Sequence, residues 1–243
     1  MKKNVLLMPG WGATCKVWES IIPVLSEGCQ INCLPPTWSS ASEINGSLSH
    51  LDDYISNVAA LIKAPTNIVA WSMGGLLAIK LANRFPQLVE QICFVSSVPK
   101  FVSEDNQNTG IDYQWFNQFV AQYQSQPIAT LKGFQTLQVK NDAAARNCLR
   151  SLVKASDFEN YNLTECGFGL RLLQEDLSEE FIALQCNTCF IHGDADAVVN
   201  LKSVEHAAYI SNSPLSILSQ AGHAPHVSQP DAVARIIKSY LFE

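Results

Sequence analysis

The chain has 243 residues, of which 47% are hydrophobic and 16% charged, and its formal net charge is −6 at pH 7. This composition is typical of a globular protein with a large buried core and excludes a disordered chain. The negative charge argues against general nucleic-acid binding, and every apolar run is too short to span a membrane. We expect a cytoplasmic monomer with no nucleic-acid or membrane partner.

Short apolar runs rich in β-branched residues recur along the chain, with helical patterns between many of them. We expect strands at residues 5–8, 30–34, 67–71, 91–95, 188–192 and 215–218. Apolar residues at helical spacing predict helices at residues 51–63, 75–84 and 230–241. Strands that alternate with helices predict an α/β protein whose mostly parallel sheet is covered on both faces.

This alternation stops between about residues 100 and 180, where the sequence contains no convincing strand. Four successive helices are predicted there, at residues 113–123, 127–137, 143–155 and 167–176. An all-helical insertion between two sheet-forming halves is typical of a cap over an active site. We predict a core made of residues 1–99 and 184–243 and a helical cap at residues 100–183.

The eight cysteines are expected to be free buried thiols, because the chain is large and begins without an export signal. Cys29 and Cys33 form a loose pair at best, and Cys186 and Cys189 form a C-x-x-C pair before an apolar strand. A zinc site would need a second pair or histidines at ligand spacing. We therefore expect no metal and no cofactor.

Ser72 lies between a buried strand and a helix rich in small residues, in the sequence Ala-Trp-Ser-Met-Gly-Gly. This context is typical of a nucleophile elbow, a sharp turn that strains the serine backbone and exposes its hydroxyl. Ala70 and Gly74 are the small neighbours that let strand and helix approach. A serine that only caps an ordinary helix is the alternative reading of this pentapeptide.

A serine hydroxyl is a weak nucleophile at pH 7 and needs a base with a pKa near the working pH, which favours histidine. His223 follows the last predicted strand, and His226 is its rival. An orienting acid should precede the histidine in the chain. Asp196 and Asp194 both follow the strand at residues 188–192, and we prefer Asp196, with Asp194 as a loop-capping residue.

Acyl transfer also needs two N–H donors that point at the developing oxyanion. The backbone N–H of Met73, the residue after the serine, is the first candidate. The second is the backbone N–H of Trp11, in the Pro-Gly-Trp-Gly sequence after the first strand. An ordinary tight turn is the alternative reading of this sequence.

Taken together, these four motifs resemble the α/β hydrolases. They are most similar to the BioH-type carboxylesterases of biotin synthesis, which hydrolyse the methyl ester of pimeloyl-[acyl-carrier protein]. The resemblance extends over nearly the whole chain, although Pro9 stands where that family usually has histidine and Ala70 where it has glycine. It implies an α/β-hydrolase fold, a serine esterase and an acyl-carrier protein as partner.

One predicted helix carries Arg146, Arg150 and Lys154 at i, i+4 and i+8, so these cations share a face. A basic face suits an acidic partner such as an acyl-carrier protein, and in the resembled family this helix grips the carrier. A solvated helix face is the alternative. Trp71 and Phe134 are expected to line an apolar channel for the acyl chain, with core packing as the alternative.

Two other functions remain open. The first is a generalist short-chain carboxylesterase or thioesterase with the same Ser72, His223 and Asp196 triad. The second is a non-catalytic binding protein that keeps the fold. A binding protein need not retain a nucleophile, a base, an acid and an oxyanion loop together, and this sequence has candidates for all four.

Overall fold

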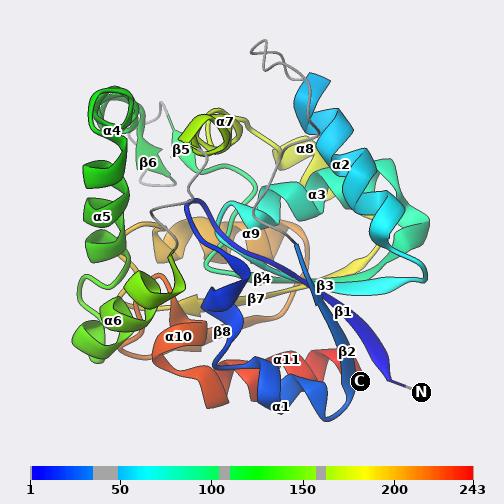
Figure 1. Ribbon diagram of the computed structural model, residues 1–243. Coiled ribbons are helices and arrows are strands. Elements are labelled where there is room, and N and C mark those ends of the chain that lie inside the picture. Colours follow the sequence, from blue (N-terminus) through cyan, green and yellow to red (C-terminus); the bar gives the residue numbers. More distant parts are fainter. Residues whose placement is uncertain (1, 35–48, 104–109, 157–162, 243) are drawn as a thin grey trace.

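The computed structural model describes residues 2–34, 49–103, 110–156 and 163–242, and its centre is a twisted parallel sheet (Figure 1). The sheet has six strands in the order β2-β1-β3-β4-β7-β8, and each of its pairings is parallel. The strands are β1 (Lys3–Met8), β2 (Cys29–Cys33), β3 (Thr66–Trp71), β4 (Val89–Val95), β7 (Asn187–Gly193) and β8 (Leu215–Leu218). All six predicted strands are present, so the predicted parallel sheet is confirmed.

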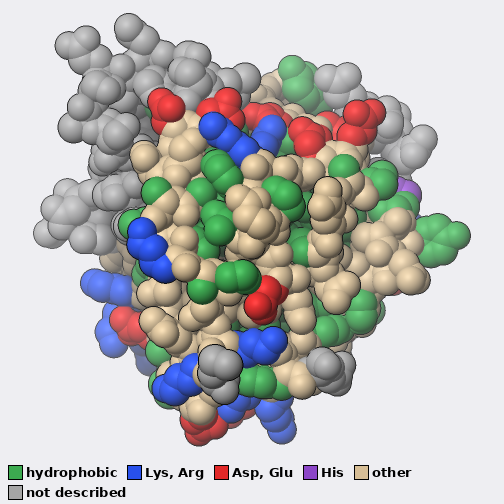
Figure 2. Space-filling view, turned by 90° about the vertical axis from the view of Figure 1, so that its right-hand side faces the viewer, with side chains coloured by type: hydrophobic (Ala, Val, Ile, Leu, Met, Phe, Trp, Pro, Cys, Tyr) green, Lys and Arg blue, Asp and Glu red, His purple; other side chains and the backbone are tan. Residues whose placement is uncertain are grey.

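Two hydrophobic cores lie on opposite faces of this sheet, because successive residues of a strand point to opposite sides. In β1, Leu6 and Met8 belong to one core, and Val5 and Leu7 belong to the other. The first core is covered by α2 (Ser49–Leu61), α3 (Gly74–Arg84) and α9 (Leu201–Ile210). The second core is covered by α1 (Ile22–Ser26) and α11 (Pro230–Phe242). On the side of the molecule shown in Figure 2, hydrophobic, acidic and basic side chains are mixed among the described residues.

The segment between β4 and β7 supplies a group of helices beside and above the sheet (Figure 1). They are α4 (Tyr113–Ser125), α5 (Pro127–Gln138), α6 (Ala145–Ala155), α7 (Leu163–Leu172) and α8 (Ser178–Ile182). The expectation of an all-helical insertion is wrong in one respect, since β5 (Val102–Ser103) and β6 (Ile111–Asp112) form a small parallel pair. Strands of two residues are too short to produce a periodic pattern. The predicted boundaries of core and cap stay a prediction.

Three short helices complete the described elements: η1 (Cys15–Trp18), η2 (Pro86–Leu88) and α10 (Pro225–Ser228). None of the helices in the described ranges combines the length and the apolar character that a membrane crossing requires.

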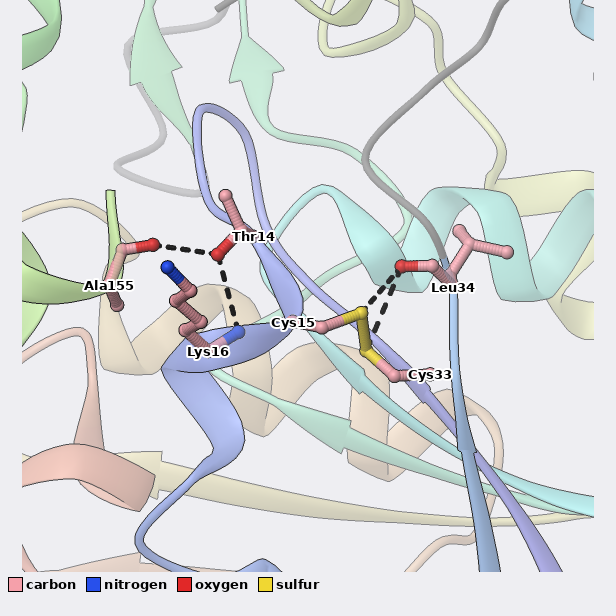
Figure 3. The surroundings of a disulfide bond; sticks show 6 residues. All are labelled: Thr14, Cys15, Lys16, Cys33, Leu34 and Ala155. Carbon is pink, nitrogen blue, oxygen red and sulfur yellow. Dashed lines mark hydrogen bonds between the residues drawn. A yellow bond between two sulfur atoms is a disulfide. The ribbon is translucent and has the colours of Figure 1, made fainter. Parts of the chain in front are cut away.

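A disulfide joins Cys15, at the start of η1, to Cys33, at the end of β2 (Figure 3). The prediction of free buried thiols is therefore wrong for these two residues, and it is confirmed for Cys29, Cys93, Cys148 and Cys189. Cys166 and Cys186 are only partly buried. The two cysteines come together because β1 and β2 are neighbours in the sheet, with Leu7 paired to Cys33. The chain that follows β1 then turns back beside β2 and brings Cys15 to Cys33. Beside it, the Thr14 hydroxyl donates a hydrogen bond to the carbonyl of Ala155 at 2.7 Å, which ties the same loop to α6.

Candidate active site

Ser72 occupies the sharp turn between β3 and α3 with a backbone φ of 53°. L residues other than Asn and Asp seldom adopt this left-handed conformation, so it persists only where the surroundings hold it. Here the Ser72 N–H donates to the carbonyl of Val95 at 2.9 Å, and its carbonyl accepts from the Ser97 hydroxyl at 2.7 Å. The strained elbow predicted from the sequence is present.

Gly74 allows the first turn of α3 to press against the end of β1. A Cβ on this residue would lie 2.6 Å from the carbonyl oxygen of Met8 and 2.9 Å from that of Pro9. Because both atoms belong to the backbone, they could not move aside, and only glycine fits. Ala70 lies fully buried on the strand before the elbow, so the sheet accommodates its methyl group.

Three side chains that are far apart in the sequence form one hydrogen-bonded chain above the carboxyl ends of the strands. Nε2 of His223 lies 2.9 Å from Oγ of Ser72, and Nδ1 of His223 lies 2.8 Å from Oδ2 of Asp196. His223 follows β8, and Asp196 follows β7. In this arrangement the hydroxyl faces one ring nitrogen, and the carboxylate sets the tautomer through the other.

Asp196 is held rigidly by its own loop. Its Oδ1 accepts hydrogen bonds from the backbone N–H groups of Val198 at 2.7 Å and Val199 at 3.0 Å. Burial acts to raise the pKa of this carboxyl, but the charge and hydrogen bond of His223 and the N–H of Val199 outweigh it and lower the pKa. Asp194 instead accepts from the N–H of Gln220 at 2.6 Å, which agrees with the loop-capping role expected for it.

The rival base, His226, lies apart from the serine. It is fully buried between Trp18 and Trp71, with ring centroids 4.4 and 4.8 Å away, and burial lowers its pKa to about 3. Sequence reasoning missed a further neighbour, His192, whose Nδ1 lies 3.7 Å from Oδ2 of Asp196. Burial lowers the pKa of His192 as well, so both rings are neutral at pH 7.

Of the two predicted oxyanion donors, Met73 follows Ser72 in the chain, and Trp11 follows Gly10, on which a Cβ would lie 3.0 Å from Cβ of Ser72. The backbone N–H groups of Trp11 and Met73 donate to no other group in the described part of the chain. The Trp11 side chain is anchored separately, because its indole N–H donates to the carbonyl of Cys166 at 2.7 Å. Its ring makes edge contacts with Phe119, Tyr123 and Phe134, so α4 and α5 pack directly on the loop.

A cavity of about 590 Å³ opens above Ser72 and Asp196. Its apolar wall includes Trp11, Phe101, Ile111, Trp115, Phe116, Phe119, Phe134, Leu137, Leu173, Val198 and Leu201. Phe134 lies in this wall, as predicted. The aromatic residues of α4 were not predicted to line the site, although their helical spacing from residue 115 to residue 123 was a usable signal.

Trp71 does not line this cavity, and that expectation is corrected. It is fully buried and points to the α11 face of the sheet, since it is the last residue of β3 and alternation sends it there. Its indole N–H donates to the carbonyl of His223 at 2.8 Å. Trp71 therefore supports the histidine loop.

Arg146, Arg150 and Lys154 are exposed on one face of α6. The opposite face of this helix is buried through Cys148, Leu152 and Ala155. None of the three cations belongs to the cavity wall. Their role as carrier contacts stays a prediction.

The chain belongs to the alpha/beta hydrolase family, whose sequence model matches residues 5–236. The expected α/β-hydrolase fold is thereby confirmed. The chain also matches the structure of a bromoperoxidase from Bacillus anthracis with a TM-score of 0.82 at 17% identity, covering 100% of this chain and 93% of that one. At this identity the likeness shows the fold alone.

Curated relatives narrow the class of enzyme. The chain is 26% identical to the "Biotin biosynthesis bifunctional protein BioHC" of Teredinibacter turnerae, over 98% of this chain but only 44% of that protein. It is 28% identical to the "Pimeloyl-[acyl-carrier protein] methyl ester esterase" of Aliivibrio salmonicida, over 94% of this chain and 88% of that protein. The chain is a carboxylic ester hydrolase of the alpha/beta hydrolase family.

Proposed function

We propose that this enzyme is a serine carboxylesterase that hydrolyses the methyl ester of pimeloyl-[acyl-carrier protein], which frees the terminal carboxylate for biotin synthesis. The observation that carries the proposal is the Ser72–His223–Asp196 chain of hydrogen bonds at 2.9 and 2.8 Å, at the base of an apolar cavity. The names of the curated relatives support the choice of substrate.

The proposed reaction has two steps that pass through an acyl-enzyme. His223 removes the proton from Ser72 as the hydroxyl oxygen attacks the ester carbonyl, and Asp196 stabilises the resulting imidazolium. The N–H groups of Trp11 and Met73 stabilise the oxyanion. The imidazolium then protonates the methoxy oxygen as its bond to the carbonyl carbon breaks, so that methanol leaves, and a water molecule activated by the same histidine releases the carboxylic acid. This scheme uses no metal and no cofactor.

The carrier protein is proposed to dock on the exposed cations of α6. Arg146, Arg150 and Lys154 present three positive charges on a chain whose net charge is −6. Charge complementarity with an acidic carrier would chiefly speed the encounter and fix the register of the two proteins. The expected cytoplasmic location, the monomeric state and the absence of nucleic-acid and membrane partners stay predictions.

Replacement of the nucleophile tests the enzymatic proposal. Ser72→Ala should lower hydrolysis of the carrier-bound methyl ester to background while the folded protein persists, because no other described side chain occupies the nucleophile's place beside His223. The assay measures ester hydrolysis and labelling by a fluorophosphonate probe, and circular dichroism checks the fold.

Complementation of a biotin-requiring strain that lacks its methyl esterase, with wild type and variant, extends the test to cells. Near-normal turnover by Ser72→Ala would contradict the proposal, and a wild type that resists labelling would indicate a binding protein.

Charge reversal on α6 tests the carrier. Arg146→Glu/Arg150→Glu should reduce kcat/KM for the carrier-bound ester about tenfold or more and leave a small methyl ester within about twofold, since only the large partner meets this face. A matched control, Lys63→Glu/Arg235→Glu, makes the same change in net charge at two exposed positions elsewhere. Equal losses on both substrates would favour the generalist esterase or thioesterase.

A further inference from the structure

The turn between α5 and α6 lies directly on the loop that carries His223. The His223 N–H donates to the carbonyl of Gln138 at 2.9 Å, and the Ala143 N–H donates to the carbonyl of Gln220 at 3.0 Å. Between these two bonds, the Gly222 N–H donates to Oδ2 of Asp142 at 2.7 Å. One segment of the insertion therefore fixes the backbone on the N-terminal side of the histidine.

Asp142 is the side chain at the centre of this contact. It is only 7% exposed, and its second oxygen, Oδ1, accepts from the N–H of Ala144 at 2.7 Å. Among the described residues it has no ion-pair partner, so backbone N–H groups alone compensate the buried charge. A buried carboxylate is tolerated only when such bonds satisfy it, and those bonds are short and directional.

The contact leaves the loop no room to shift. A Cβ on Gly222 would lie 2.9 Å from the carbonyl oxygen of Gln138 and 3.2 Å from Cβ of Asp142, so the two backbones touch. On the other side of the histidine, its carbonyl accepts from the Trp71 indole at 2.8 Å. Because both peptide groups of His223 are fixed, its ring is preorganised in the position that contacts Ser72 and Asp196.

We propose that Asp142 is a positioning residue for the base. Its carboxylate holds the Gly222 peptide so that Nδ1 of His223 stays within hydrogen-bond distance of Asp196 while Nε2 faces Ser72. Asp142 neither touches the substrate nor transfers a proton. This inference rests on the proposed function and assigns the α5–α6 turn a part in catalysis through the histidine loop.

The pH dependence of the reaction separates positioning from simple structural support. The base must be neutral to accept the proton of Ser72, so kcat/KM falls on the acid side as the ring becomes protonated. A ring that loses its contact with Asp196 holds a proton less well, and the acid limb then moves to lower pH. The other titratable groups around the ring are His192, whose pKa burial lowers, and His226, whose pKa burial lowers to about 3. Beside Asp142 lies Cys148, whose pKa is raised to about 12 by burial and by the charge of Asp142, so it does not titrate in this range.

The test compares Asp142→Ala and Asp142→Asn with wild type on a small neutral methyl ester. Asp142→Ala should lower kcat about tenfold or more, keep KM within about twofold and move the acid limb to lower pH, because a misplaced base slows chemistry and not binding. Asp142→Asn retains one acceptor oxygen and should be intermediate. The control is Asp176→Ala, which removes a carboxylate that accepts the Ser178 N–H at 3.0 Å and pairs with Lys100 at 2.9 Å, in the segment between α7 and α8. It should lower the thermal midpoint without moving the pH profile.

A pH profile of Asp142→Ala that is scaled down uniformly, in proportion to loss of folded protein, would overturn the inference, as would an unchanged kcat. If Asp142→Ala does not fold, Asp142→Asn decides by the same readouts. Retained turnover by Ser72→Ala would instead remove the proposed function, so the two failures are distinguishable.

Discussion

At Ser72 the position required of the side chain conflicts with the preferred backbone conformation. Its hydroxyl must project from the elbow toward His223, and the turn that makes this projection possible forces a backbone φ of 53°. A residue with a Cβ is strained in this region, whereas glycine is not. The strain is held by the hydrogen bonds to Val95 and Ser97 on both sides of the residue.

We therefore predict that Ser72→Gly is more stable than Ser72→Ala by about 1 kcal/mol, although both lack the nucleophile. The two variants differ only in the Cβ that the left-handed conformation penalises. Urea denaturation of both proteins at pH 7 measures the difference. Equal midpoints, or a less stable glycine variant, would show that the elbow stores no such strain.

The catalytic candidates were predictable because each is placed by the element before it. Ser72, Asp196 and His223 all follow strands of the parallel sheet, and the carboxyl ends of such strands meet at one edge of the sheet. Asp142 and His192 have no such local signal. Their importance comes from contacts with residues distant in sequence, such as the bond of Asp142 to Gly222, and no pattern around them predicts these contacts.

Among the elements, most long and periodic segments were predicted, and most of the shortest ones were not. The four inner strands of the main sheet, β1, β3, β4 and β7, read as apolar runs because most of their residues are buried. The edge strands β2 and β8 were also predicted, although several of their residues are partly or fully exposed. β5 and β6 have two residues each and α10 has four, too few for a period to be recognised. α9 was missed despite buried residues at helical spacing, Val204, Ala207 and Ala208, which were a usable signal. The disulfide between η1 and β2 depends on strand order, which spacing along the chain does not reveal.

Reduction of the Cys15–Cys33 disulfide should destabilise the protein. The bond closes a loop with a sequence separation of 18, and loops of this length restrict the unfolded chain enough to stabilise the folded state by roughly 3 kcal/mol. Urea denaturation with and without a phosphine reductant measures this difference. The double variant Cys15→Ser/Cys33→Ser is the control, since reductant should not change its midpoint. A wild type that unfolds at the same urea concentration in both conditions would contradict the prediction.

At the scale of the whole molecule, the fold buries two histidines that the proposed reaction does not use, His192 in β7 and His226 in α10. His226 lies in the α11-side core with neither ring nitrogen hydrogen-bonded among the described residues, and His192 lies beside Asp196. Burial lowers the pKa of His226 from 6.5 to about 3 and lowers that of His192 as well. In the unfolded chain both rings recover an ordinary pKa near 6.5. Unfolding below that pH is therefore accompanied by proton uptake.

This linkage predicts a loss of stability in mild acid. A histidine whose pKa is lower in the folded state contributes its full stability above the unfolded pKa, and that stability declines as the pH falls from 6.5 toward 3. Between pH 7 and pH 5, His226 alone should reduce the free energy of unfolding by about 2 kcal/mol. His226→Leu removes this proton uptake and leaves that of His192 in place. The variant's unfolding free energy should therefore fall by about 2 kcal/mol less than that of wild type over the same range.

Urea denaturation of both proteins at pH 5, 6 and 7 measures how steeply each unfolding free energy changes with pH. Parallel slopes for the two proteins would mean that His226 is protonated to the same extent in the folded and unfolded states. A lower overall stability of His226→Leu would not affect this comparison, because the difference in slope depends only on protons taken up and not on the packing between Trp18 and Trp71.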